Sequence, residues 1–124
     1  WLQSLPKSST AKFLVTKSPK RSSIWQTYGH TLCVTKQEID YIFDVEDELY
    51  AGLWLFAKHV AKGLKNAVPC KRVCIVVIGD EVRHTHVHLL PFNSMEDVTF
   101  SRGAKVELSA DEMRDLAAKI AQAV

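Results

Sequence analysis

Three histidines alternate with other residues along one short segment of the chain. His84, His86 and His88 are each separated by a single residue. Side chains of a β-strand point alternately to its two faces, so on a strand these imidazoles would share one face about 6.5 to 7 Å apart. The residues that alternate with them would face the other side and could pack on a core: Thr85, Val87 and Leu89.

A row of imidazoles on a rigid strand is suited to chemistry at phosphorus. A neutral imidazole can attack a phosphoryl group and form a covalent intermediate. A neighbouring imidazole can donate a hydrogen bond to a phosphoryl oxygen or protonate a leaving group. Histidine ordinarily titrates near neutral pH, so one residue type can take both roles. The main-chain amides of the turn at Gly79 would add further donors to a phosphate.

Two other interpretations of the same residues stay open. A His-x-His pair on a strand can present two zinc ligands, although no carboxylate or thiol has an obvious position as a further ligand. The second interpretation is a plain solvent-facing strand. It leaves unexplained why three of the five histidines of the chain alternate strictly among apolar residues.

The segments around the histidines predict a sheet. The apolar run from Arg72 to Gly79 predicts a strand covered on both faces, and a polar turn at 80–83 would join it in a hairpin to a strand at 84–90, ended by Pro91. Thr31–Thr35 and Phe13–Thr16 are candidate strands. The remaining N-terminal residues, 1–10 and 17–23, are typical of a loose tail and a basic solvated loop.

Two helices are predicted beside the sheet. Asp44 would cap a long helix that Pro69 closes, with one apolar face formed by Leu49, Leu53, Phe56, Val60 and Leu64 and widened by Trp54, Ala57 and Ala61. Ser109 and Glu112 form a capping box at the start of a C-terminal helix. Its hydrophobic staple would be Leu108 and Met113, and its buried stripe Met113, Leu116, Ala117 and Ile120. The predicted fold class is α+β, with a mostly antiparallel sheet.

Composition limits the class of protein. The 124 residues suit one domain, and a net charge of +2 is too small to predict binding to a nucleic acid polymer or a membrane surface. No segment is apolar enough for a membrane span, and no signal peptide is recognisable. Cys33 is expected to be a core thiol, and Cys70 and Cys74 are too few for a disulfide framework, so we expect a cytoplasmic protein. The chain begins without methionine, as a fragment or processed chain would.

Several motifs resemble one family. Residues 84–90, His-Thr-His-Val-His-Leu-Leu, resemble the pattern His-φ-His-φ-His-φ-φ of the histidine triad (HIT) nucleotide hydrolases and transferases, where φ is apolar and Thr85 is a tolerated exception. Residues 29–36 resemble the family segment Gly-His-x-Leu-Val-x-Pro-Lys, and residues 79–84 are similar to Gly-x-Glu-Val-Pro-His of bacterial members. The resemblance covers about 29–92. It implies a HIT-like fold, with residues 1–28 as an atypical N-terminal segment and 29–124 as a HIT domain with a C-terminal helical extension.

The resemblance implies a role for each histidine. His86 would be the nucleophile that attacks the α-phosphorus of a nucleotide derivative and becomes nucleotidylated. His88 would contact the phosphate and the leaving group, and His84 would orient its neighbours. His30 would be an accessory active-site histidine, although a histidine in a turn before a strand is an equally simple interpretation.

The resemblance also implies substrates and partners. The substrate would be a nucleoside phosphoramidate, a dinucleoside polyphosphate or an adenylated adduct, and no cofactor or metal would be required. Phe13 and Leu14 would line the nucleoside pocket, and Gly79 would lie at the phosphate. The family forms homodimers in which two sheets join through the long helix and the strand after it.

The chain departs from the family at several positions. The region 13–19 has no aspartate to bind ribose, which keeps open a nucleotide-binding module with little turnover. An N-terminal Cys-x-x-Cys is absent and Glu38 replaces a frequent histidine, so structural zinc is not expected. Asp80 and Glu81 replace polar phosphate-binding residues. We expect Glu81 to pair with Arg83.

Overall fold

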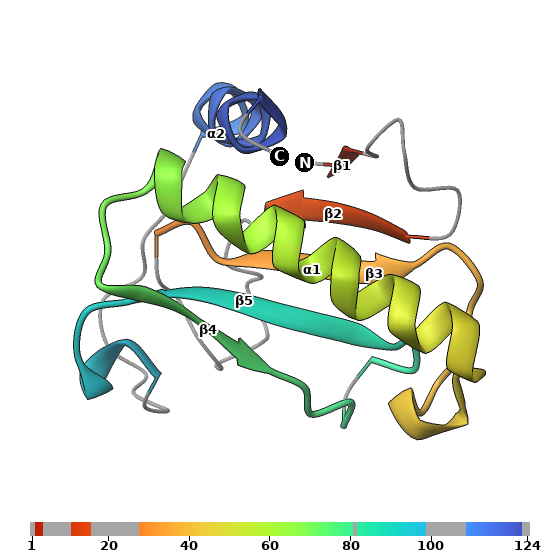
Figure 1. The fold of residues 1–124 in the computed structure, drawn as a ribbon. Coiled ribbons are helices and arrows are strands. Elements are labelled where there is room, and N and C mark those ends of the chain that lie inside the picture. The colour runs from red at the N-terminus through yellow and green to blue at the C-terminus, as the bar shows by residue number, and fades with distance from the viewer. Residues whose placement is uncertain (1, 4–10, 16–27, 81, 99–108, 123–124) are drawn as a thin grey trace.

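The computed structural model describes residues 2–3, 11–15, 28–80, 82–98 and 109–122 (Figure 1). An antiparallel sheet is formed in the order β1-β2-β3-β5-β4 by β1 (Leu2–Gln3), β2 (Ala11–Val15), β3 (Thr31–Thr35), β5 (His86–Phe92) and β4 (Arg72–Val76). The helical elements are η1 (Ile42–Asp44), α1 (Asp47–Ala67), η2 (Met95–Val98) and α2 (Ala110–Gln122). The predicted α+β class is confirmed.

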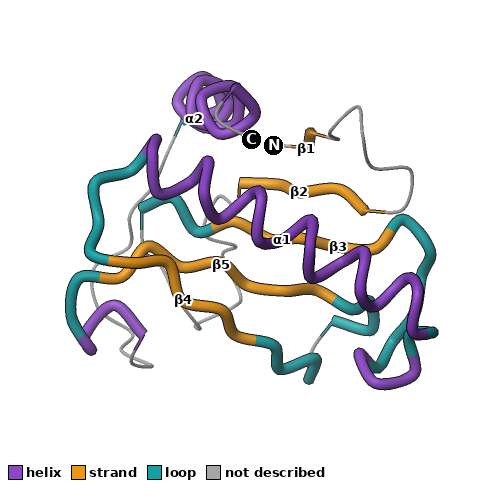
Figure 2. Tube along the Cα trace, in the orientation of Figure 1, coloured by secondary structure: helices purple, strands orange, loops and turns teal. Residues whose placement is uncertain are grey.

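The long helix α1 lies across one face of the sheet, and α2 packs beside it (Figures 1 and 2). The predicted stripe of α1 is buried, and Trp54 and Ala61 lie partly buried at its margin. Facing it from the sheet are three fully buried side chains of β3 and β5: Cys33, Val87 and Leu89. Burial raises the pKa of the Cys33 thiol far above its usual range, as expected of a core thiol. The opposite face of the sheet carries the histidines.

The start of α1 differs from the prediction. Asp44 ends the short helix η1 and does not cap α1, whose first turn begins at Asp47 after Glu46. The buried side chains of Ile42 and Val45 anchor this connection to the core, and the amide of Val45 donates to the carbonyl of Ile42 at 3.2 Å. The chain therefore makes a separate 3-10 turn before the helix begins.

The predicted hairpin is confirmed, with different strand ends. β5 begins at His86, so His84 precedes the strand, and Pro91 lies inside it opposite Val73. The pairing of β3 with β5 ends at Thr31 and Leu89. Pro91 lies beyond that end, so its missing amide proton does not remove a hydrogen bond between β5 and β3.

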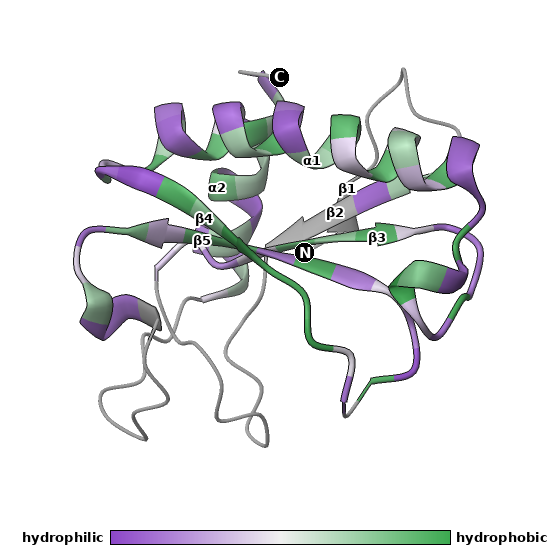
Figure 3. Ribbon diagram, turned by 60° about the horizontal axis from the view of Figure 1, so that its bottom comes forward, coloured by the Kyte–Doolittle hydropathy of each residue, from purple (hydrophilic) through white to green (hydrophobic). Residues whose placement is uncertain are grey.

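The strand β4 is the edge of the sheet rather than a strand covered on both faces. It ends at Val76, three residues before Gly79. Ile75 and Ile78 are 45% and 46% exposed. The prediction of cover on both faces was wrong for the single chain, because none of the five residues of β4 is buried. Hydrophobic residues dominate β4 and the segment after it (Figure 3).

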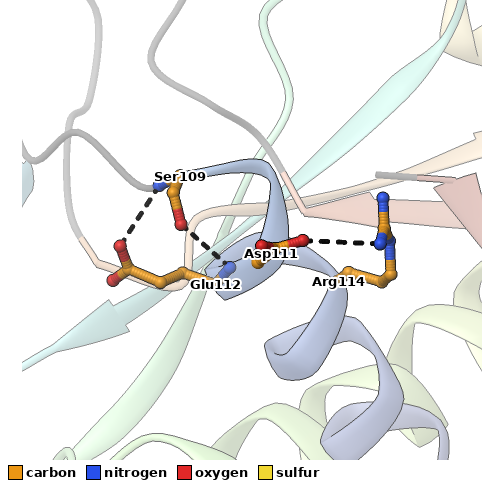
Figure 4. A network of polar contacts seen from close by, with 4 residues as sticks. All are labelled: Ser109, Asp111, Glu112 and Arg114. Carbon is orange, nitrogen blue, oxygen red and sulfur yellow. Dashed lines mark hydrogen bonds and ion pairs between the residues drawn. The ribbon is translucent and has the colours of Figure 1, made fainter.

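The start of α2 forms the predicted capping box (Figure 4). The amide of Glu112 donates to Oγ of Ser109 at 3.1 Å, and the amide of Ser109 donates to Oε1 of Glu112 at 3.3 Å. Leu116, Ala117 and Ile120 are buried as predicted. Leu108, the other half of the predicted staple, lies outside the described residues.

The N-terminal residues add two strands to the sheet. Leu2–Gln3 pairs with β2, so part of the predicted loose tail is a short strand. The predicted strand at 13–16 is observed as Ala11–Val15. The predicted basic loop lies outside the described residues. None of the helices described is long and apolar enough to cross a membrane.

Candidate functional site

The register of β3 and β5 sets the histidines on one face of the sheet. His86 pairs with Val34 and His88 with Leu32, whereas the core residue Val87 pairs with Cys33. His30 directly precedes β3 and is 8% exposed. The structure brings His30 against His88, the last histidine of the predicted row.

His84 is oriented by the main chain at the end of β3. Its Nε2 lies 2.7 Å from the carbonyl oxygen of Thr35. A carbonyl can only accept, so Nε2 of His84 carries the proton and donates it. Although His84 lies outside the strand proper, this bond fixes its ring at the end of the histidine row.

His86 is oriented by the residue two positions before it. Its Nδ1 lies 2.7 Å from the carbonyl oxygen of His84, so Nδ1 is the donor. In a neutral imidazole the other nitrogen then carries the lone pair. The main chain of His84 therefore selects the tautomer of His86 in which Nε2 can act as a nucleophile or a hydrogen-bond acceptor.

His30 and His88 form a second pair. Nε2 of His30 lies 2.8 Å from Nδ1 of His88, and the rings stack with centroids 5.1 Å apart. One nitrogen must donate and the other accept, so the pair cannot hold this bond with both rings charged. Burial, and then the charges of His30 and His86, lower the pKa of His88 to about 3. His88 is therefore neutral at physiological pH.

Thr85 anchors the approach to β5 from the core side. Its side chain is 2% exposed, and its hydroxyl donates to the carbonyl of Ile39 at 2.7 Å. Its amide donates to the same carbonyl at 2.6 Å. These bonds fix the backbone between His84 and His86 to the connection after β3. Thr85 therefore positions both imidazoles without belonging to their row.

Two cavities adjoin His86. The first, of about 190 Å³, is lined by Asp40, Tyr41, Ile42, Val77, Ile78, Gly79, Thr85 and His86. The second, of about 280 Å³, is lined by Lys12, Leu32, Val34, Val82, His84 and His86. Gly79, predicted at the phosphate, therefore lies on a cavity that also reaches His86. Its φ of 77° is in the left-handed region that favours glycine.

The predicted nucleoside-pocket residues are placed by strand register. Leu14 pairs with Leu32, a residue of the histidine face, and Phe13 pairs with the core residue Cys33. Their contact with a nucleoside stays a prediction. Within the described parts of the chain, no three His, Cys, Asp or Glu side chains are grouped as metal ligands would be. Glu81, and with it the expected pair to Arg83, lies outside the described residues.

Sequence reasoning missed four residues of the site. The carbonyl of Thr35 leaves no trace in residue types, since any residue supplies one. The hydroxyl of Thr85 had a signal, a polar side chain at a position where the pattern has an apolar one. Lys12 and Asp40 each line a cavity beside His86, but they are distant from the histidine motif along the chain.

Comparison with known proteins matches most of the chain to one family. Residues 15–95 match the family model described as the HIT domain. An uncharacterized HIT-like protein of Borreliella burgdorferi is 25% identical over 101 residues, which cover 76% of this chain and 73% of that protein.

Solved structures share the fold at lower identity. A histidine triad protein of Sinorhizobium meliloti superposes with a TM-score of 0.76 at 20% identity, covering 94% of this chain and 85% of the other. The diadenosine triphosphate hydrolase of Plasmodium falciparum, solved with cyclomarin A, superposes with a TM-score of 0.68 at 18% identity, covering 93% and 71%.

Proposed function

Because the chain belongs to the histidine triad (HIT) family, we propose that it is a nucleotide hydrolase or transferase acting at an α-phosphate. The observation that supports this most directly is the orientation of His86. Its Nδ1 is engaged by the carbonyl of His84 at 2.7 Å, which leaves Nε2 as the nucleophilic nitrogen beside two cavities.

The proposed reaction has two steps. Nε2 of His86 attacks the α-phosphorus, and the bond from phosphorus to the leaving atom breaks with its electron pair on that atom. The leaving atom takes up a proton from solvent that is relayed through the hydrogen-bonded pair of His30 and His88, because a neutral His88 can pass a proton on only as it accepts another. Water then attacks the phosphorus of the nucleotidyl-histidine, the bond from phosphorus to Nε2 of His86 breaks, and a nucleoside monophosphate is released. The proton of the water leaves to solvent through the same pair. His84 and His30 hold the two reacting imidazoles.

The proposed substrate is a nucleoside phosphoramidate, a dinucleoside polyphosphate or an adenylated adduct. The similarity in fold to the diadenosine triphosphate hydrolase of Plasmodium falciparum supports the second of these. We also propose that the protein works in the cytoplasm as a homodimer. The three cysteines are free thiols, which suits a reducing compartment.

Turnover of adenosine phosphoramidate in the presence of a chelator tests this function. The wild-type protein should release adenosine monophosphate, and His86→Ala should lose at least about a hundredfold in kcat, as expected when a nucleophile is removed. His59→Ala is the matched control, because His59 is an exposed histidine on α1. Equal activity of wild type and His86→Ala would show that the nucleophile is misassigned.

The same preparations separate the two alternatives. A nucleotide-binding module is favoured by the lack of an aspartate in residues 13–19; it would bind adenosine monophosphate tightly with no turnover. A metal centre that uses the same histidines would hold stoichiometric zinc in the purified protein, and metal analysis would detect it.

A further inference from the structure

Lys12 lies on the face of the sheet that carries the histidines. It pairs with Val34 across β2 and β3, and Val34 pairs with His86 across β3 and β5. Residues paired across neighbouring strands point to the same face. Lys12, Val34 and His86 therefore form one transverse row, although 74 positions separate Lys12 from His86 in the sequence (86 minus 12).

The spacing of this row fits a phosphate between its two ends. Neighbouring strands lie about 4.8 Å apart, so the Cα atoms of Lys12 and His86 are about 10 Å apart across the sheet. The four-carbon stem of lysine extends its ammonium well beyond the Cα atom. Both side chains line the same cavity. A phosphate attacked by His86 is therefore within reach of the Lys12 ammonium.

The surroundings of Lys12 favour an anion. Half of the residues that line the cavity are apolar, namely Leu32, Val34 and Val82, and Lys12 itself is partly buried. An apolar stem can pack along such a surface with its charge at the rim. Beside apolar side chains, a contact between opposite charges is weakened less by solvent than it is in bulk water.

The charges beside His86 also single out Lys12. Among the described residues that line the two cavities beside His86, Lys12 is the only lysine or arginine, and Asp40 is the only carboxylate. A neutral imidazole such as His88 can donate a hydrogen bond to a phosphate, but it does not neutralise the charge of the phosphate. A neutral histidine therefore leaves the negative charge of the phosphate uncompensated, and the ammonium of Lys12 can compensate it.

We propose that Lys12 binds a non-bridging oxygen of the nucleotide phosphate that His86 attacks. This inference rests on the proposed function and adds a phosphate-binding residue from outside the histidine motif. The contact neutralises charge in the bound substrate and in the nucleotidylated intermediate. It does not depend on which base or leaving group the substrate carries.

Binding of adenosine monophosphate and adenosine to three variants tests the assignment. Lys12→Met keeps the length of the side chain without the charge, Lys12→Arg keeps the charge, and Lys58→Met removes an exposed lysine of α1. By calorimetry, Lys12→Met should weaken adenosine monophosphate binding on the order of tenfold, as expected for a charge-assisted hydrogen bond. The affinity of Lys12→Met for adenosine should equal that of the wild type. Lys12→Arg should retain most of the affinity, and Lys58→Met all of it.

Three results would overturn the inference. Lys12→Met could bind adenosine monophosphate as wild type does, or lose equal affinity for adenosine, which would indicate a packing role. Wild type could also fail to bind adenosine monophosphate. Failure of the proposed function would give a different result: the wild type would bind adenosine monophosphate but would not hydrolyse adenosine phosphoramidate. Thermal unfolding of each variant separates a lost contact from a lost fold.

Discussion

Two carbonyl groups and one hydroxyl orient the histidines. The carbonyl of Thr35 accepts from His84 at 2.7 Å, and the carbonyl of His84 accepts from His86 at 2.7 Å. The hydroxyl of Thr85 ties the backbone between them to the carbonyl of Ile39. The ring of His86 is therefore held through Nδ1, which leaves Nε2 for the reaction, and this is the arrangement that a nucleophilic imidazole needs.

His88 gives the stability of the protein a particular pH dependence. Its pKa is about 3 in the folded chain, below the ordinary 6.5. Between these values the unfolded chain binds a proton that the folded chain does not. The contribution of His88 to stability is therefore fully present above about pH 6.5, and is lost progressively as the pH falls toward about 3.

Urea unfolding of wild type and His88→Gln from pH 8 to pH 4 measures this effect. Glutamine does not titrate and can still accept or donate a hydrogen bond to His30. The wild type should lose more free energy of unfolding than His88→Gln does as the pH falls below 6.5. Parallel curves for the two proteins would contradict the lowered pKa of His88.

At the scale of elements, two glycines turn the chain on either side of the site. Gly29 and Gly79 have φ angles of 85° and 77°. A Cβ at Gly29 would lie 3.0 Å from Cγ2 of Val68 and 3.2 Å from Cγ of Pro91, whereas a Cβ at Gly79 would meet no atom within 4 Å. The turn at Gly29 is therefore packed against α1 and β5, and the turn at Gly79 is open.

Substitution of each glycine by alanine separates strain from packing. Gly79→Ala should cost about 1 to 2 kcal/mol, because the left-handed conformation is unfavourable for a residue with a Cβ. Gly29→Ala should cost more, since its methyl group also collides with Val68 and Pro91. Because His30 follows Gly29 directly, this variant should also lose turnover. Equal free energies of unfolding of the two variants in urea would show that Val68 and Pro91 move aside without an energetic cost.

The sequence predicted which helices and strands form more accurately than the residues at which they begin and end. The apolar stripe of α1, the capping box of α2 and the strand hairpin were predicted, because each depends on local periodicity or on two neighbouring side chains. The start of β5 at His86 was not predicted. His84 lies before the strand and bonds with Thr35, and a contact between residues so far apart in the chain leaves no local pattern. The inclusion of Pro91 depends on where β3 ends, which is also a tertiary property.

The site was predictable to the same extent. Alternation alone placed His86 and His88 on one face and Val87 on the other. Lys12 and Asp40 could not be found, because they join the site through strand register and through the connection after β3. Residue type gives no sign of such a neighbour until the strands are paired.

At the scale of the whole molecule, no described element pairs with the outer edge of β4. Ile75 on β4 and Leu55 on α1 are 45% and 59% exposed, and α1 contacts β4. An apolar edge strand favours pairing with another chain. These are the elements through which the family resemblance implies a dimer, so we expect two copies to pair across β4 and α1.

Sedimentation of single variants tests the assembly. Wild type should sediment as a dimer, and Ile75→Glu should shift it to a monomer, because a carboxylate would be buried in the interface. Met95→Glu is the control, since Met95 is 67% exposed on η2 and is outside the expected interface. A monomeric wild type, or a dimeric Ile75→Glu, would contradict this expectation.

The bonds of Thr35 and His84 to the histidine rings have a consequence for how the protein can change over evolution. The accepting groups belong to the main chain, so most neighbouring side chains can be replaced without altering which nitrogen of His86 is free. A shift of β3 against β5 by one residue would move the carbonyl of Thr35 away from the ring of His84, and with it the ring at the start of the histidine row. Insertions and deletions within these two strands are therefore the changes that selection should remove most strictly, more strictly than most point substitutions around the site.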